Sequence, residues 1–258
     1  MTHSSRITAP LATLAAALLL AACSGGSNSD PATAPVTPPV STAPTTATYE
    51  VTLVNLTAGQ PLSPMVVVAH DDGFALFNVG ETASVALEHL AEAGESAPLV
   101  ALAGASKSVY ASAVAPGDPL VPGAGNKAVV TLTVPLTSLP TLKLSMASML
   151  SNTNDGFAGL AGESLAKLDV GTTLTTRLLG YDAGTEANTE SADTLPGPAA
   201  AGISGKHEGF NATRDDVVNT VHLHPGVVSK DDGLPKSALT QAQRWDNPVA
   251  LLSIKRTQ

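Results

Sequence analysis

The chain has few of the residues on which several functional classes depend. Among its 258 residues it has one cysteine, 3% aromatic residues, and 13 basic against 22 acidic residues, which gives a formal net charge of −9. A single cysteine excludes a disulfide within the chain. Nucleic-acid recognition needs a surplus of basic side chains, so this acidic composition argues against nucleic acid as a partner.

Complete catalytic motifs are also missing from the sequence. The patterns G-x-S-x-G, H-E-x-x-H and G-x-x-x-x-G-K-[ST] do not occur. The run from Ser164 to Lys167 has the S-x-x-K spacing of serine acyl enzymes, but the S-D-N and K-T-G motifs that accompany it there are absent. We therefore expect a protein that is not an enzyme.

The amino terminus has the pattern of a bacterial lipoprotein signal. Arg6 precedes an apolar run at residues 11–20, and the LAAC motif that ends at Cys23 resembles a lipobox. The apolar run is too short to span a membrane as a helix. We expect residues 1–22 to be a signal peptide and Cys23 to carry lipid, so that only the lipid anchor contacts the membrane. The expected location is the outer membrane, facing the periplasm or the cell surface.

A tether follows the expected lipidation site. Residues 23–46 are rich in proline, threonine, alanine and serine and show no hydrophobic periodicity. Such a segment buries too little apolar surface to offset the entropy of ordering, so we expect it to be disordered. Residues 47–258 remain, which is enough chain for one domain with a hydrophobic core.

The folded part is expected to consist mainly of strands. Apolar patterns bounded by turn residues occur in eight stretches, residues 48–56, 65–70, 107–115, 127–134, 142–150, 174–181, 217–223 and 249–256. The third and fourth stretches are expected to form an antiparallel hairpin. A helical period occurs at residues 80–93, with a second helical turn at 97–102. We therefore predict an all-β fold, an antiparallel β-sandwich of about eight strands with one or two short helices.

Two acidic turns are associated with these strands. Residues 152–156, NTNDG, follow the strand at 142–150, and residues 181–190, YDAGTEANTE, end the strand at 174–181. Oxygen-rich turns of this kind suit a hard cation such as Ca²⁺, although a solvated acidic loop has the same composition. Consecutive antiparallel strands point in opposite directions, so both turns lie at one end of the sandwich only if the chain crosses back between them. Residues 162–171 are long enough for that crossing.

Three short motifs match the pattern of one known family. Residues 148–159 are SMLSNTNDGFAG, residues 181–186 are YDAGTE, and LSP at 62–64 follows the opening strand at 49–56. In this order they resemble the amino-terminal spondin domain, whose two turns are S-M-x-x-P-S-x-D-W-F-x-G and Y-D-A-G-T-D. That domain occurs in extracellular matrix proteins of animals and in bacterial lipoproteins, and the resemblance covers most of residues 48–256.

The resemblance implies a C2-like β-sandwich with a calcium ion at one end. By position in the motifs, the calcium carboxylates would be Asp155, Asp182 and Glu186. Glu186 stands where the animal members have aspartate, and its side chain reaches one methylene farther. Glu190 has no counterpart in the family motif and is left out of the expected site. Backbone carbonyls and waters would supply the remaining oxygens that Ca²⁺ needs.

Two histidines and the single tryptophan leave other roles open. His222 and His224 are two residues apart at the end of an expected strand, so both would face one side and share a metal, although no third ligand is identifiable. Trp245 precedes the last strand, where packing in the core is the expected role and an exposed binding surface is the alternative.

The leading hypothesis is a lipid-anchored binding or adhesion module of the cell envelope. It would bind calcium at one end of the sandwich and hold a protein or glycan partner with its loops. One alternative is a metal-dependent envelope hydrolase that uses His222 and His224. Another is a purely structural envelope lipoprotein without a ligand.

Overall fold

The structure is a computed structural model, and it describes residues 43–123, 125–204, 206 and 208–258. The expected signal peptide at residues 1–22, the expected lipidation site Cys23 and the tether as far as residue 42 lie outside these residues. No helix in the described part is long and apolar enough to cross a membrane. The first strand begins at Thr46, next to the expected start of the domain at residue 47.

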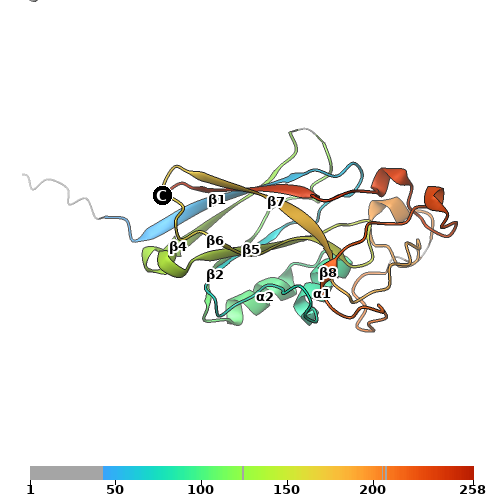
Figure 1. The fold of residues 1–258 in the computed structure, drawn as a ribbon, viewed down its shortest axis with the longest axis horizontal. Coiled ribbons are helices and arrows are strands. Elements are labelled where there is room, and N and C mark those ends of the chain that lie inside the picture. Colours follow the sequence, from blue (N-terminus) through green and yellow to red (C-terminus); the bar gives the residue numbers. More distant parts are fainter. Residues whose placement is uncertain (1–42, 124, 205, 207) are drawn as a thin grey trace, which may run out of the picture. The chain divides into compact units, whose positions relative to one another are not determined.

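The described strands form an antiparallel sandwich of two layers (Figure 1). One layer contains β4 (Ala128–Pro135), β1 (Thr46–Asn55), β9 (Ala250–Arg256) and the first part of β7 (Thr173–Asp182). The other contains β3 (Val109–Val114), β2 (Val66–His70), β5 (Lys143–Met149), β6 (Gly156–Ser164), the end of β7 and the short β8 (His222–Leu223). The strand order is β3-β2-β5-β6-β7-β9-β1-β4, with β8 beside β7. The predicted all-β sandwich is confirmed.

β7 joins the two layers because its two halves pair with different strands. Residues 173–178 pair with β9, whereas residues 179–182 pair with β6. β7 therefore starts in one layer and ends in the other. Its last residue, Asp182, lies opposite Gly156, the first residue of β6.

The main hydrophobic core lies between the two layers. β1 alternates buried with mostly half-buried residues, as a strand with one face on a core does, and its buried side chains include Tyr49 and Leu53. They belong to one cluster with Leu144 of β5 and Leu252 of β9. Burial of one such side chain contributes about 1.5–3 kcal/mol, so this cluster is the main source of stability for the sandwich.

Two helices cover the outer face of the layer that contains β2 and β5 (Figure 1). They are α1 (Val85–Ala93) and α2 (Ala97–Ala105). The helix predicted at residues 80–93 starts only at Val85, because the Ser84 side chain accepts a hydrogen bond from Leu87 N at 3.1 Å and caps the first turn. Gly94, with a φ of 69°, ends the helix in the left-handed conformation that glycine favours.

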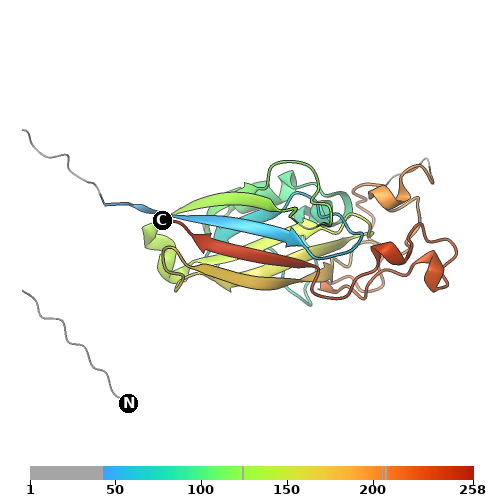
Figure 2. The ribbon, with the colours of Figure 1, turned by 90° about the horizontal axis from the view of Figure 1, so that it is seen from above.

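The described residues 183–204, 206 and 208–249 form a region of loops beyond the strand ends, which we call the loop end (Figure 2). Apart from β8, its regular structure consists of three short 3-10 helices, η2 (Pro198–Ala200), η3 (Lys230–Asp232) and η4 (Gln241–Gln243). A further 3-10 helix, η1 (Leu136–Thr141), connects β4 with β5. The loop end carries much of the polar chemistry described below.

Two predictions of strand arrangement are wrong. The stretches 107–115 and 127–134 do not form a hairpin, because β3 pairs with β2 and β4 pairs with β1, at opposite ends of the strand order. The strand predicted at 217–223 is reduced to His222–Leu223. Asp216 Oδ1 accepts a hydrogen bond from Val218 N at 2.8 Å. This contact stabilises a turn at residues where the alternating pattern predicted a strand.

A strand missing from the prediction makes the crossing between the two acidic turns. It is β6, whose sequence GFAGLAGES lacks the alternation of apolar and polar residues that marks most strands. The crossing therefore begins at Gly156, before the expected segment at 162–171. β5 brings the chain to the loop end, β6 takes it away and β7 brings it back, so both acidic turns lie at the same end.

Candidate cation site

Asp155 lies in the turn between β5 and β6, and its side chain is fully buried. Its Oδ2 accepts hydrogen bonds from Thr185 N (2.7 Å), Glu186 N (3.1 Å) and the Thr185 hydroxyl (3.1 Å), which connects the first acidic turn to the second. Its Oδ1 has no partner among the described residues. Burial, reinforced by the Asp182 carboxylate, raises the pKa of Asp155 to about 8. A buried oxygen without a partner is costly, so a proton or a cation at this atom would stabilise the site.

Asp182, at the end of β7, is also fully buried. Its Oδ1 accepts a hydrogen bond from Gly184 N at 2.8 Å, and its Oδ2 accepts one from the Asn188 side chain at 2.7 Å. Gly184 has a φ of 70°, and a Cβ atom there would lie 2.4 Å from Val218 O. Only glycine fits this turn, which explains the glycine of the YDAGTE motif.

A third carboxylate, Asp216, comes from the loop before β8. One oxygen each from Asp155, Asp182 and Asp216 lie within 4.8 Å of one another. Because Ca–O distances are about 2.3–2.6 Å, two ligands of one Ca²⁺ ion are separated by at most about 5 Å. The three aspartates therefore fit a single cation. The sequence prediction missed Asp216, because the VVNTVHL run after it has the pattern of a strand. The two adjacent aspartates at residues 215 and 216 were the feature of the sequence that could have indicated a ligand here.

Helix α1 holds the segment that carries Asp216. Arg214 donates hydrogen bonds to both carboxylate oxygens of Glu88, from Nε at 3.1 Å and from Nη2 at 2.7 Å. Asn211 N donates to Glu92 Oε2 at 2.8 Å. Both glutamates are buried, so these contacts are shielded from water. The body of the domain therefore fixes the loop two residues before Asp216.

Glu186, the third carboxylate implied by the family motif, lies beside the group of three aspartates and is not a member of it. Its amide N–H contacts Asp155, whereas its Oε1 accepts a hydrogen bond from the Asn154 side chain at 2.9 Å. Burial raises the pKa of Glu186 to about 8, and the charges of Glu92, Asp155 and Glu208 add to this effect. Its side chain therefore belongs to a second acidic environment next to the first.

Three other titratable side chains lie near Asp182. His222 Nδ1 is 3.9 Å from Asp182 Oδ1. His224 is 4% exposed, its Nε2 has no partner in the described part of the chain, and burial lowers its pKa to about 4. The buried Oε2 of Glu190 likewise has no partner among the residues that the structure describes, and burial raises the pKa of Glu190 to about 7. Neither histidine joins a group of three converging metal ligands within the described residues.

A comparison of the sequence with models of known families identifies the family of this domain. A model of the Spondin_N family matches residues 55–201, which is more than half of the chain. The chain belongs to the spondin amino-terminal domain family. The match contains Asp155, Asp182 and Glu186 and ends before Asp216. Membership of this family indicates an extracellular or envelope module. A comparison with curated proteins found no match.

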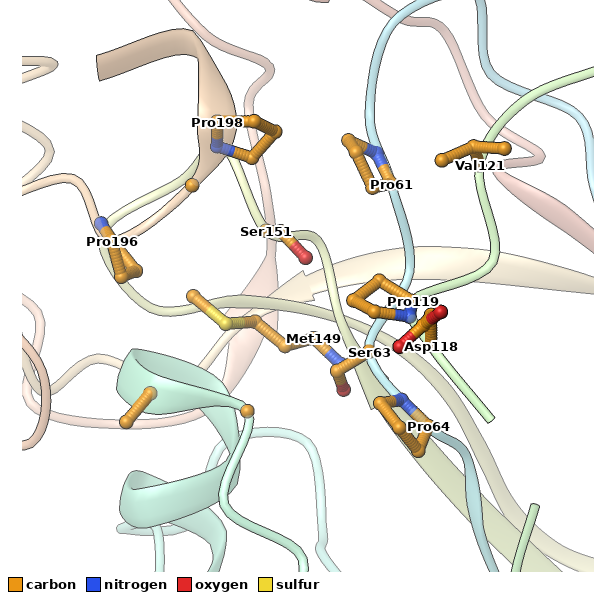
Figure 3. A pocket seen from close by; sticks show the side chains of 13 residues that line it. Pro61, Ser63, Pro64, Asp118, Pro119, Val121, Met149, Ser151, Pro196 and Pro198 are labelled. Atoms are coloured by element: carbon orange, nitrogen blue, oxygen red, sulfur yellow. The ribbon is translucent and has the colours of Figure 1, made fainter. Parts of the chain in front are cut away.

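An apolar pocket of about 440 Å³ begins close to the first acidic turn of this spondin-type domain (Figure 3). Its walls include five prolines and a methionine: Pro61, Pro64, Pro119, Pro196, Pro198 and Met149. Two of the walls are joined by hydrogen bonds, from Met149 N to Ser63 Oγ and from Ser151 N to Pro61 O, each 2.9 Å. The pocket is therefore preformed. Ser151 lines it and precedes Asp155 by four residues.

Proposed function

We propose that this spondin-type domain is a lipid-anchored binding module of the cell envelope that binds one Ca²⁺ ion at its loop end. The observation that carries the proposal is the convergence of Asp155, Asp182 and Asp216, with oxygens within 4.8 Å of one another. A divalent cation would offset the repulsion among the three carboxylates and give Asp155 Oδ1 a partner.

The ion would connect three segments that are far apart in the sequence, namely the turn after β5, the turn after β7 and the loop before β8. In this proposal the ion fixes the loops, and the loops hold a protein or glycan partner, in a binding rather than a catalytic role. The preformed apolar pocket beside the first turn is the kind of concave surface that binds an apolar group of a partner.

The lipid anchor is supported by the LAAC motif at residues 20–23 and by the proline-rich residues that follow it. Lipid on Cys23 would attach the domain to the outer membrane, facing the periplasm or the cell surface. Mass spectrometry of the protein purified from membranes tests this part. We expect a lipid-modified Cys23 at the amino terminus and none in Cys23→Ser. An unmodified chain that begins before residue 23 would contradict it.

Calorimetry with Ca²⁺ tests the cation site. We expect a dissociation constant of about 10⁻⁴ to 10⁻³ M, as in other extracellular calcium modules. Asp155→Asn and Asp182→Asn should abolish the heat of binding, and Asp216→Asn should weaken binding at least about tenfold, which corresponds to about 1.4 kcal/mol. Asp118→Asn, at an exposed aspartate of another loop, is the matched control and should bind as the wild type does.

The same experiment distinguishes the two possible third ligands. Loss of binding in Glu186→Gln together with normal binding in Asp216→Asn would assign the third position to Glu186, as the family motif implies. Absence of heat in the wild type, with a melting temperature that neither Ca²⁺ nor a chelator changes, would overturn the calcium proposal.

A further inference from the structure

A polar groove of about 500 Å³ lies between the turn after β1 and the segment before β9. It is lined by Leu56, Gln241, Arg244, Trp245 and Asp246, among others. Trp245 is the only tryptophan of the chain. Leu56 is 46% exposed. Leu56 lies in the part of the chain that the family model matches, and the other four of these residues lie outside it.

The walls of the groove are attached to the body of the domain. Gln243, at the end of η4, takes part in a reciprocal capping box, in which its Oε1 accepts a hydrogen bond from Thr240 N at 2.9 Å. Gln60 Nε2 donates to Gln243 O at 2.9 Å. Gly59 packs so closely on Ala242 that a Cβ atom would lie 2.2 Å from the Ala242 carbonyl oxygen. A ligand would therefore meet a preformed groove and lose little free energy in ordering it.

Trp245 is held by packing against both the main core and the apolar cluster that contains Leu195 and Leu239, and it also lines the groove. Its ring centroid lies 5.0 Å from that of the buried His224, and it packs against the main core. It is only half-buried, and it lines the groove. An aromatic ring held in this way is a platform on which a flat apolar face can stack.

The polar groups beside this platform include both donors and acceptors. Arg244 Nη1 donates to Asp232 Oδ1 at 2.9 Å, and its other side-chain N–H groups bond to none of the described residues. The side chains of Asp246 and Gln241 make no hydrogen bond to the described residues. An apolar ligand would leave these groups desolvated without partners, and the net charge of −9 disfavours a polyanion. A sugar combines an apolar ring face with hydroxyl groups that donate and accept.

We propose that this groove binds a saccharide, with a sugar ring stacked on Trp245 and its hydroxyl groups bonded to Arg244 and Asp246. The inference rests on the proposed binding role of the domain and names the chemical class of one ligand. It does not depend on the cation site, since none of the groove residues belongs to the group of aspartates.

Fluorescence provides a specific test, because the emission of the single tryptophan reports on this groove. The purified protein is titrated with chitotetraose, maltotetraose and cellotetraose, once with Ca²⁺ and once with a chelator. We expect at least one of them to change the Trp245 emission in both buffers. Arg244→Gln and Asp246→Asn should each raise the dissociation constant about tenfold, the loss expected for a hydrogen bond to a charged group.

Two controls separate the groove from its surroundings. Arg177→Gln repeats the chemical change of Arg244→Gln on the exposed face of β7, and Asp169→Asn repeats that of Asp246→Asn at an exposed aspartate of another loop. Both should keep the wild-type dissociation constant. The proposal is overturned if none of the three oligosaccharides changes the emission, if Arg244→Gln and Asp246→Asn respond as the wild type does, or if tetra-alanine gives an equal response. If a saccharide changes the emission but calorimetry shows no heat of Ca²⁺ binding, only the calcium proposal is refuted. If Ca²⁺ binds but no saccharide changes the emission, only the saccharide proposal is refuted.

Discussion

The strands and the loop end of this domain are stabilised in different ways. The strands β1 to β7 and β9 share a large apolar cluster and pair their backbone groups with neighbouring strands. The loop end has an apolar cluster of five buried residues, Ala192, Leu195, Ala200, Val227 and Leu239. There, side chains such as that of Glu190, which accepts a hydrogen bond from Val228 N, satisfy the backbone. Apolar packing therefore positions the strands, whereas polar contacts position the candidate ligands.

The largest effect is expected from the same substitution made once in each region. Leu53 of β1 and Leu239 of the loop end are both fully buried. Leu→Ala substitutions cost about 2–5 kcal/mol, depending on how far the surroundings collapse into the cavity. Paired strands around Leu53 relax little, so we expect a loss of about 4 kcal/mol for Leu53→Ala and about 2 kcal/mol for Leu239→Ala in urea unfolding. Equal losses of unfolding free energy in the two variants would contradict the view that the strands and the loop end are stabilised in different ways.

The next effect concerns the contact that holds the loop end to α1. Arg214→Gln leaves the buried Glu88 without its cation. Breaking a fully buried pair costs about 3–5 kcal/mol, and because Arg214 is partly exposed we expect a loss of about 2 kcal/mol. We also expect weaker Ca²⁺ binding in calorimetry, since Asp216 follows Arg214 by two residues. Arg177→Gln, on the exposed face of β7, is the control and should change neither quantity.

The strands were largely predictable from the sequence, because alternating side chains reflect a buried and an exposed face. Seven of the eight predicted stretches agree with a strand to within two residues at each end, and β6 was missed because its glycine-rich sequence does not alternate. β3 and β4 were assigned to one hairpin, because periodicity identifies a strand without specifying its partner.

The loop end was less predictable, since no period describes a region held by side-chain contacts. The two motifs located Asp155 and Asp182, and the structure brings both into one group. Asp216 was missed because its position depends on Arg214 and Glu88, which are 126 residues apart in the sequence. The buried environments of Glu190 and His224 likewise depend on contacts that the residue pattern does not encode.

The pH dependence of stability tests the buried acids of the loop end. Burial raises the pKa of Glu190 to about 7, above its value in the unfolded chain, so the folded state binds more protons than the unfolded state. Stability should therefore fall as the pH rises through this range, by up to about 1.4 kcal/mol between about pH 5.5 and about pH 6.5 for one proton. In Glu190→Gln this part of the decrease should disappear from chelator-containing melts. Glu81→Gln, at an exposed position, should keep the wild-type slope; parallel curves for all three proteins would contradict the prediction.

The smallest expected effect concerns the start of α1, the element that contacts both regions. The Ser84 side chain caps α1, whereas Ser96 precedes α2 without a side-chain capping bond. Ser84→Ala should therefore lower the free energy of unfolding by about 1 kcal/mol, and Ser96→Ala should change it little.

Glu88 and Glu92 hold the loop end from the turns that follow this cap. If they position Asp216, Ser84→Ala also weakens Ca²⁺ binding in calorimetry while Ser96→Ala does not. Lower stability with unchanged Ca²⁺ affinity would show instead that the loop end keeps its shape without the capped first turn of α1.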